Sequence, residues 1–179
     1  MSQASKHVEW CLNKAKKEIE ECRKLNKKGK HRGLLVVGYD EELAKSHIAK
    51  AEHNVKAAQH LIAGNYFDTS MGAIFYSMYH CFLAIASKFG YESSNQSCTI
   101  SLMEFLKERE KINIDSKFIE LFKYGDEINS FEESVIQMRE DLTYGVKTNA
   151  DQNKINELLR MCRTLIDQTK DVVYEVNRK

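Results

Sequence analysis

Apolar residues recur at three- and four-residue steps over most of the chain, which is the spacing of one buried face of an α-helix. Over residues 4–28 the stripe contains Val8, Cys11, Leu12, Ala15, Ile19 and Cys22. The same spacing returns after Asp40, through Ile48, Ala51, Val55, Ala58 and Ile62, and again over residues 155–176. Asp40 is a good N-cap for the second of these segments, and Gly64 is expected to end it. The pattern predicts long amphipathic helices joined by short turns.

Residues 68–90 are apolar on nearly every side, unlike the amphipathic segments around them. We therefore expect a helix capped by Asp68 that forms the central and most buried part of the core. Residues 33–38 form a short apolar run between two glycines. No second strand is evident to pair with this run, so we interpret it as an extended connection lying on the core.

Shorter helices are expected in the second half of the chain. The pattern places them over residues 99–110, 115–124 and about 127–143, with a break near Tyr124 and Gly125 and an end at Gly145. Asn149 or Asp151 is expected to cap the last long helix.

Composition supports an all-helical fold. The chain of 179 residues has no proline and only 8 glycines, and these residues are the usual breakers of helices. We predict an all-α antiparallel helical bundle with an additional N-terminal helix. Residues 1–39 would form that helix and a connector packed on the bundle, and residues 40–179 would form the bundle domain.

The overall charge favours no particular kind of partner. Lys and Arg number 27 against 26 for Asp and Glu, a formal net charge of +1, so no global field draws the chain to nucleic acid or to a membrane. Basic residues concentrate between Arg23 and Arg32. A solvated helix end is the simpler interpretation of this run, because cations favour helix C-termini. The alternative is phosphate contact with RNA.

The five cysteines are scattered and form no C-x-x-C pair. Those on apolar helical stripes are interpreted as small buried hydrophobes in a reducing compartment. The N-terminus has no apolar signal core, and no run approaches the roughly 20 apolar residues that span a bilayer, so we expect a cytoplasmic protein with no membrane segment.

Sequence motifs for cofactors and metals are missing. The glycines at 33 and 38 are not followed by Lys-Ser/Thr, so they do not form a P-loop, and no G-x-G-x-x-G occurs. None of the six histidines follows a glutamate by three residues, and H-E-x-x-H does not occur. We predict neither a cofactor nor a metal site.

His80 lies in the middle of the apolar third helix, one turn after Tyr76, so the two side chains share a face. The simpler interpretation is a core histidine hydrogen-bonded to a tyrosine or a carbonyl. The alternative is a histidine in a pocket or interface. His53 and His60 lie opposite the Val55 stripe and are expected to be solvated.

A second candidate group ends a predicted helix just before Gly145. Asp141 and Tyr144 are three residues apart and can touch, whereas Arg139 and Tyr144 are separated by about 140° around an ideal helix. One interpretation is an Asp–Arg–Tyr network that fixes the helix end. The other is a phosphate or nucleotide site formed by Arg139, Asp141 and Tyr144 with His80 and Tyr76.

Three stretches together resemble the HEPN superfamily of helical bundles. Residues 73–84 (AIFYSMYHCFLA) and 88–90 (KFG) are similar to the second core helix of many prokaryotic HEPN proteins. Residues 139–145 (REDLTYG) fall where the family places an arginine followed four to six residues later by a histidine. Residues 47–54 (HIAKAEHN) look like the first core helix. The resemblance covers about residues 41–177.

The resemblance implies a homodimer of the kind that works with a nucleotidyltransferase in toxin–antitoxin-like pairs. Many such proteins are metal-independent ribonucleases, in which arginine and histidine from two protomers assist attack by a ribose 2′-hydroxyl. Here Tyr144 stands at the histidine position, and no histidine follows Arg139. Tyrosine has a pKa near ~10, so it is a poor general base at neutral pH.

Our leading hypothesis is therefore a dimeric HEPN-like module that binds a nucleotide, RNA or a nucleotidyltransferase partner, with weak or no catalysis. The first alternative is a metal-independent endoribonuclease that uses Arg139 with Tyr144 or His80. The second is a structural interaction protein, which a buried, ion-paired Arg139 would favour.

Overall fold

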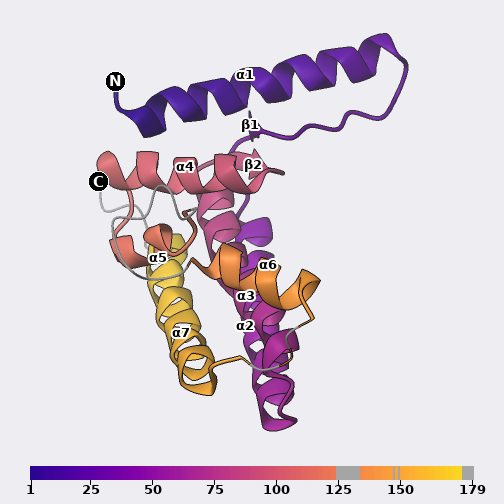
Figure 1. Ribbon diagram of the computed structural model, residues 1–179. Coiled ribbons are helices and arrows are strands. Elements are labelled where there is room, and N and C mark those ends of the chain that lie inside the picture. The colour runs from indigo at the N-terminus through magenta and orange to yellow at the C-terminus, as the bar shows by residue number, and fades with distance from the viewer. Residues whose placement is uncertain (124–133, 147, 149, 175–179) are drawn as a thin grey trace.

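The computed structural model describes residues 1–179 except 124–133, 147, 149 and 175–179 (Figure 1). The described residues form seven helices and two short strands. In chain order these are α1 (Gln3–Lys24), β1 (Leu34–Val36), α2 (Glu41–Ala63), α3 (Phe67–Lys88), β2 (Tyr91–Ser93), α4 (Gln96–Glu108), α5 (Ser116–Glu120), α6 (Val135–Tyr144) and α7 (Gln152–Tyr174). The all-α bundle expected from the sequence is confirmed.

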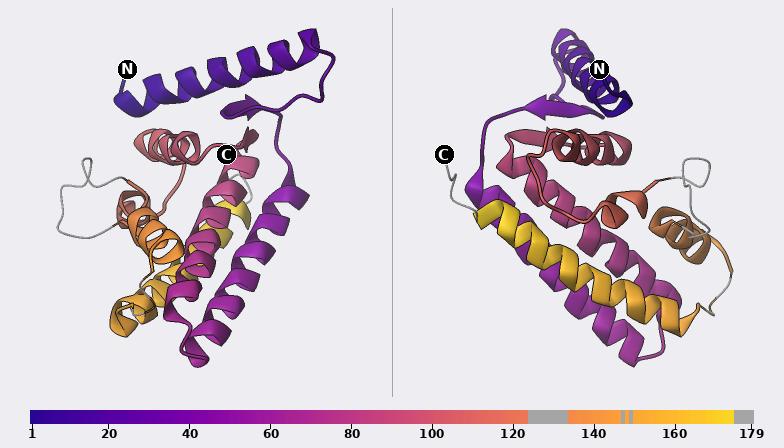
Figure 2. Two further views of the ribbon diagram at one scale, coloured as in Figure 1. Left: turned by 45° about the vertical axis from the view of Figure 1, so that its right-hand side comes forward. Right: turned by 90° about the vertical axis from the view of Figure 1, so that its left-hand side faces the viewer.

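Helix α3 is the centre of the bundle, as its apolar sequence predicts. It packs against α2, α7, α6 and α4, and the antiparallel pair α2–α3 with α7 across it forms the main layer (Figure 2). Its wholly buried side chains include Met71, Ile74, Met78, Phe82 and Ile85. Of the described helices, α3 has the length and hydropathy to cross a membrane, and 61% of its most apolar stretch is buried inside the bundle. A buried core helix of a helical bundle has the same length and hydropathy, so these two properties do not distinguish it from a membrane-spanning helix.

Small residues let α2 lie close to α3. Ala44, Ala51 and Ala58 recur every seven residues along α2 and are wholly buried. The buried Ser77 hydroxyl on α3 donates to the carbonyl of Ala51 at 3.0 Å, so this polar group in the seam has a partner. The α2–α3 pair is therefore a closely spaced platform that presents residues of both helices on its outer side.

Several helix ends agree with the sequence analysis. The Asp40 carboxylate accepts from the backbone N–H of Leu43 at 2.8 Å, and Gly64 follows the last residue of α2. Asp151 accepts from the N–H groups of Asn153 and Lys154, so it caps α7, whereas Asn149 lies outside the described residues. His53 and His60 are exposed, as expected.

The cap expected at Asp68 is wrong, because α3 begins one residue earlier, at Phe67, and Tyr66 takes the N-cap position without a side-chain hydrogen bond. Helix α4 begins at Gln96 because the Asn95 side chain accepts from the N–H of Cys98. The expected helix over 115–124 is only the five residues of α5. The one over 127–143 begins at Val135 in the described part, where Ser134 caps it, and the break at Tyr124 and Gly125 lies outside that part.

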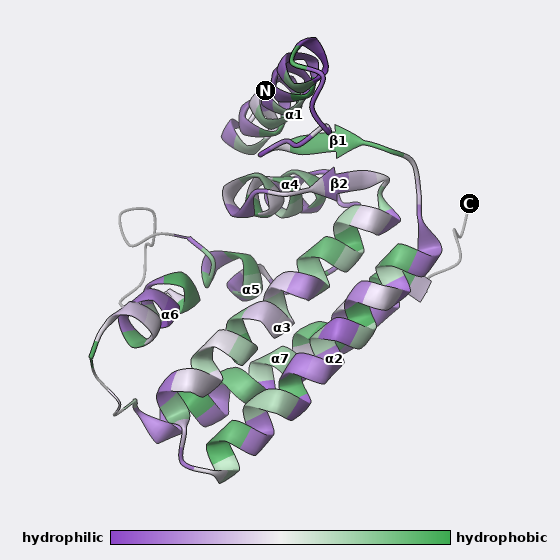
Figure 3. Cartoon of the chain, turned by 90° about the vertical axis from the view of Figure 1, so that its right-hand side faces the viewer, coloured by the Kyte–Doolittle hydropathy of each residue, from purple (hydrophilic) through white to green (hydrophobic). Residues whose placement is uncertain are grey.

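The apolar run over residues 33–38 is paired, contrary to expectation. Leu34 to Val36 form β1, which lies antiparallel to β2, with Leu34 opposite Ser93 and Val36 opposite Tyr91. The strand, green in Figure 3, lies between α1 and β2. Its first side chain, Leu34, is wholly buried. This two-stranded ribbon attaches the N-terminal segment to the end of the bundle.

Helix α1 lies across this end of the molecule and packs on α4 and β1 (Figure 1). Its buried face is Ala4, Val8, Cys11 and Ala15. The interpretation of Cys11 as a free thiol is wrong, because Cys11 forms a disulfide with Cys98 of α4. Cys81 and Cys162 are free and buried, as the sequence analysis expects.

Candidate functional site

Helix α6 brings Arg139 onto the aromatic surface of α3. Val135, Ile136 and Met138 are buried, and they press α6 against α3. Arg139 lies at the edge of this contact, with Cζ 4.3 Å from the centre of the Phe75 ring. A guanidinium at this distance is attracted by the negative face of the ring.

The guanidinium of Arg139 also has an acidic partner. Its Nη2 lies 3.1 Å from Oε1 of Glu140, the next residue along the chain. The Arg139 side chain is 18% exposed and that of Glu140 is 36% exposed. Arg139 is therefore held in place by an aromatic ring and a partly solvated carboxylate, and part of its charge reaches solvent.

Phe75 belongs to a group of aromatic rings. Its ring stacks on Tyr79 at 6.0 Å and lies 5.3 Å from Phe122, both on the core side. Phe75 also makes an edge-to-face contact with Tyr76, with the ring centres 5.2 Å apart. Tyr76 lies at the surface and is 49% exposed. Phe75 thus contacts both Arg139 and Tyr76, so one ring links the two side chains.

Asp141 and Tyr144 have different surroundings from Arg139. The Asp141 carboxylate accepts from the Gln137 side-chain amide at 2.8 Å, one turn back along α6. Tyr144 is 80% exposed at the end of α6, and the N–H of Gly145 donates to the carbonyl of Asp141. Arg139 pairs with Glu140 and Asp141 pairs with Gln137, so the two side chains belong to separate pairs.

His80 has a histidine as its partner. Its Nδ1 lies 3.0 Å from Nδ1 of His47 on α2, so one of the two imidazoles donates to the other. Burial lowers the pKa of His47 to about 4, with a further contribution from His80. Burial also lowers the pKa of His80, and nearby Lys50 adds to this effect. Both rings are therefore neutral at pH 7.

His47 is the residue of this pair that the sequence analysis does not single out. The apolar positions of the helical stripe include Ile48 but not His47, which directly precedes it. Its proximity to His80 depends on the register between α2 and α3, which are packed through the alanine seam. A sequence pattern contains no information on that register, so the pair becomes visible only in the folded chain.

We group the residues that these contacts link under one name, the Tyr76–His80 face. Tyr76 and His80 are one helical turn apart, about 40° around α3. Phe75 and His80 are separated by about 140°, so Arg139 and His80 lie at opposite edges of this face. Its members are Arg139, Tyr76, His80, His47 and Lys50.

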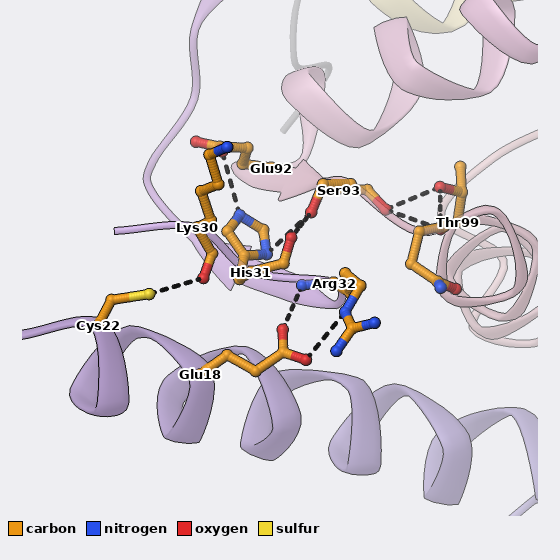
Figure 4. A network of polar contacts seen from close by, with 10 residues as sticks. Glu18, Cys22, Lys30, His31, Arg32, Glu92, Ser93 and Thr99 are labelled. Atoms are coloured by element: carbon orange, nitrogen blue, oxygen red, sulfur yellow. Dashed lines mark hydrogen bonds and ion pairs between the residues drawn. The ribbon is translucent and has the colours of Figure 1, made fainter. Parts of the chain in front are cut away.

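The end of the basic run, at His31 and Arg32, contacts acidic groups. Glu18 accepts from the backbone N–H and the side-chain Nε of Arg32, and these bonds lower the pKa of the Glu18 carboxyl (Figure 4). Nε2 of His31 lies 3.1 Å from Oε1 of Glu92 on β2. These contacts fasten the connector to α1 and β2, which favours a structural role for this part of the run.

The comparisons with known proteins agree with the resemblance noted in the sequence. The HEPN domain model matches residues 44–172, which is most of the chain, so this protein belongs to the HEPN family. The match contains every residue of the Tyr76–His80 face and leaves out α1 and the connector. No curated protein matches the chain.

Proposed function

We propose that this HEPN protein is a binding module for RNA or a nucleotide, that it acts as a homodimer, and that it has weak or no catalytic activity. The observation that carries this proposal is the Arg139 guanidinium fixed on Phe75 beside the half-exposed ring of Tyr76.

The chemistry of the Tyr76–His80 face suits a nucleotide. A guanidinium offers parallel N–H donors to a phosphate, and one already fixed on a ring loses less side-chain entropy when it binds. An exposed tyrosine ring can stack on a base, which contributes about 1–3 kcal/mol per base. Lys50 adds a positive charge near His80. Binding of phosphate at Arg139 would displace Glu140.

Weak catalysis follows from the placement of the candidate bases. Tyr144 is 80% exposed at the end of α6, and a phenol is in general a poor base at pH 7. His80 is neutral and could accept a proton, but it is bonded to His47 at the opposite edge of the face from Arg139.

Endoribonuclease activity, with Arg139 assisted by Tyr144 or His80, is the alternative enzymatic function. The lowered pKa of His80 favours it, because a neutral imidazole is the form that takes a proton. In a dimer, Tyr144 of one copy could also approach the Arg139 of the other. The partly covered and ion-paired state of Arg139 is the observation that favours a purely structural role.

Two partner proposals accompany this function. The end of α6 leaves apolar surface uncovered, with Tyr144 80% exposed and Val146 99% exposed, and a second copy of the chain would bury it. A nucleotidyltransferase partner in a toxin–antitoxin-like system rests on the family resemblance. An adjacent reading frame without a nucleotidyltransferase, and none co-purifying with the protein, would contradict that pairing.

The RNA-binding proposal is tested by fluorescence anisotropy on labelled transfer RNA and a mixed-sequence single strand, in EDTA. We expect the dissociation constant of Arg139→Ala to rise about tenfold, which corresponds to about 1.4 kcal/mol. Arg160→Ala is the matched control, since Arg160 is exposed on α7 and outside the face. Equal affinities for all three proteins would contradict the proposed site.

A further inference from the structure

Three side chains that commonly bind metals meet where α1 crosses α4. They are His7, Cys11 and Cys98, and their donor atoms all lie within 4.8 Å of one another. His7 and Cys11 are four residues apart and so lie on the same face of α1. Cys98 is in the first turn of α4. Both α1 residues fall outside the segment that matches the HEPN domain.

The surroundings of the cluster are ordered and apolar. Cys11 and Cys98 are wholly buried, and Val8 is nearly so. The Ser101 hydroxyl lies 2.8 Å from Nδ1 of His7, one turn after Cys98 on α4. With Nδ1–H donating to the Ser101 hydroxyl, the imidazole is fixed and Nε2 keeps its lone pair, as metal-binding histidines require.

A cleft borders the His7 member of this cluster. It has a volume of about 540 Å³ and is lined by His7, Ser101, Ile100, Glu104 and Glu108 among others. His7 is partly exposed, whereas Cys11 and Cys98 are wholly buried. His7 is therefore the ligand of the three that faces the cleft.

We infer that the reduced form of this cluster is a binding site for a thiolate-preferring divalent cation of the zinc type. Two thiolates and one imidazole match the preference of such ions for sulfur and nitrogen, and three protein ligands leave a fourth tetrahedral position for water from the cleft. The position of Cys98 in the first turn of α4 favours its thiolate, because a helix N-terminus stabilises negative charge.

The disulfide and the metal site are alternative states of the same two cysteines. Binding of the cation to the reduced chain releases the two thiol protons and changes no oxidation state. Oxidation by hydrogen peroxide removes two electrons and two protons from the thiols, forms the S–S bond and gives two molecules of water. Because a disulfide offers no thiolate, oxidation releases the cation. Both states tie α1 to α4, and only the reduced, metal-free chain lacks the link.

The test uses Co²⁺ as a spectroscopic probe on the full chain, reduced and kept anaerobic. We expect one Co²⁺ per chain with thiolate-to-cobalt charge-transfer absorption, displaced by Zn²⁺. Cys98→Ser should lose this absorption. Losing a residue that only hydrogen-bonds to a metal ligand lowers metal affinity roughly 10- to 100-fold. His7→Ala should lower the Co²⁺ affinity by more than this, because His7 is proposed to bind the ion directly. The matched controls are Cys22→Ser, a free cysteine on α1, and His53→Ala, an exposed histidine; both should bind as the wild type does.

The inference is overturned if the reduced wild type shows no thiolate-to-cobalt band. It is also overturned if the disulfide form, or His7→Ala, binds Co²⁺ as tightly as the reduced wild type. Circular dichroism checks the fold of each variant. If Cys98→Ser does not fold, the Co²⁺ affinities of His7→Ala and of the oxidised wild type still test the inference. His7 is partly exposed, so its substitution is expected to leave the fold intact.

Discussion

The guanidinium of Arg139 lies 4.3 Å from the centre of the Phe75 ring. The same ring makes an edge-to-face contact with Tyr76, which lies at the surface. A cation, a buried ring and an exposed ring are thus in contact across α6 and α3. This relationship links Arg139, at the position where the family resemblance expects an arginine, to the exposed side of the central helix.

Removing the negative charge at Glu140 should strengthen RNA binding. Glu140 is 3.1 Å from Arg139 and competes with phosphate for the same guanidinium. A partly exposed ion pair of this kind is worth up to about 1 kcal/mol, so Glu140→Gln should lower the dissociation constant by up to about fivefold at low salt. Glu157→Gln, at an exposed position on α7, is the control for net charge. A weaker or unchanged affinity of Glu140→Gln relative to the control would contradict a phosphate site at Arg139.

Tyr76 should contribute through its ring and not through its hydroxyl. We expect Tyr76→Phe to bind RNA as the wild type does, and Tyr76→Leu to bind about 5- to 150-fold more weakly, as the loss of one stacked base predicts. Tyr174→Leu is the matched control, because Tyr174 is 50% exposed on α7 and Tyr76 is 49% exposed. Anisotropy titrations of the four proteins measure this, and equal losses for Tyr76→Leu and Tyr174→Leu would exclude a specific stacking role.

Stability should fall in mild acid because of the His47–His80 pair. Burial lowers the pKa of His47 from 6.5 to about 4 in the folded chain. Below pH 6.5 the unfolded chain therefore binds a proton that folded His47 does not, so the stabilisation present above pH 6.5 is lost as the pH falls towards 4. The loss between pH 7 and pH 5 should be roughly 1–2 kcal/mol, allowing for the partial exposure of the ring.

Denaturant titrations at the two pH values measure this loss. His47→Gln keeps a hydrogen-bonding side chain without the titration, and we expect it to flatten the pH dependence. His53→Gln, at an exposed position on the same helix, should leave the dependence as in the wild type. A wild-type slope that survives in His47→Gln would assign the acid sensitivity to other groups.

The close packing of α1 against residue 33 requires glycine at that position, because there is no room for a side chain. A Cβ at this position would lie 2.3 Å from the backbone carbonyl oxygen of Cys11 and 3.1 Å from the Cβ of Ala15. Gly33→Ala must therefore push β1 and α1 apart, and we expect a loss of about 1–3 kcal/mol in unfolding free energy. Gly29→Ala is the control, because nothing lies within 4 Å of its Cβ. Equal stability of the two variants would contradict this close approach.

The sequence pattern predicts the helices well where burial is periodic and a cap is local. The α2 stripe and the Asp40 cap are examples, since both depend only on residues a few positions apart. The central position of α3 was predictable because few polar residues interrupt it. The Arg139 segment was singled out by its residue types at a predicted helix end, and the family resemblance, which the domain match supports, pointed to the same segment.

Long-range pairings could not be predicted in the same way. β1 is only three residues long and pairs with β2 more than fifty residues later, so neither segment has a recognisable strand pattern alone. The disulfide joins cysteines 87 residues apart, and five cysteines allow many pairings. The contacts His47–His80 and Arg139–Phe75 depend on helix register and on the angle at which α6 crosses α3.

The central claim is that the Tyr76–His80 face binds RNA without cutting it efficiently. The most direct measurement follows bound and cleaved RNA in the same sample, with the protein in excess over a labelled single strand in EDTA. We predict a saturable complex that contains intact RNA and is weakened in Arg139→Ala. Rapid, metal-independent cleavage that is lost in Arg139→Ala would contradict weak catalysis and make this protein a ribonuclease. No complex with the folded protein would contradict RNA binding itself.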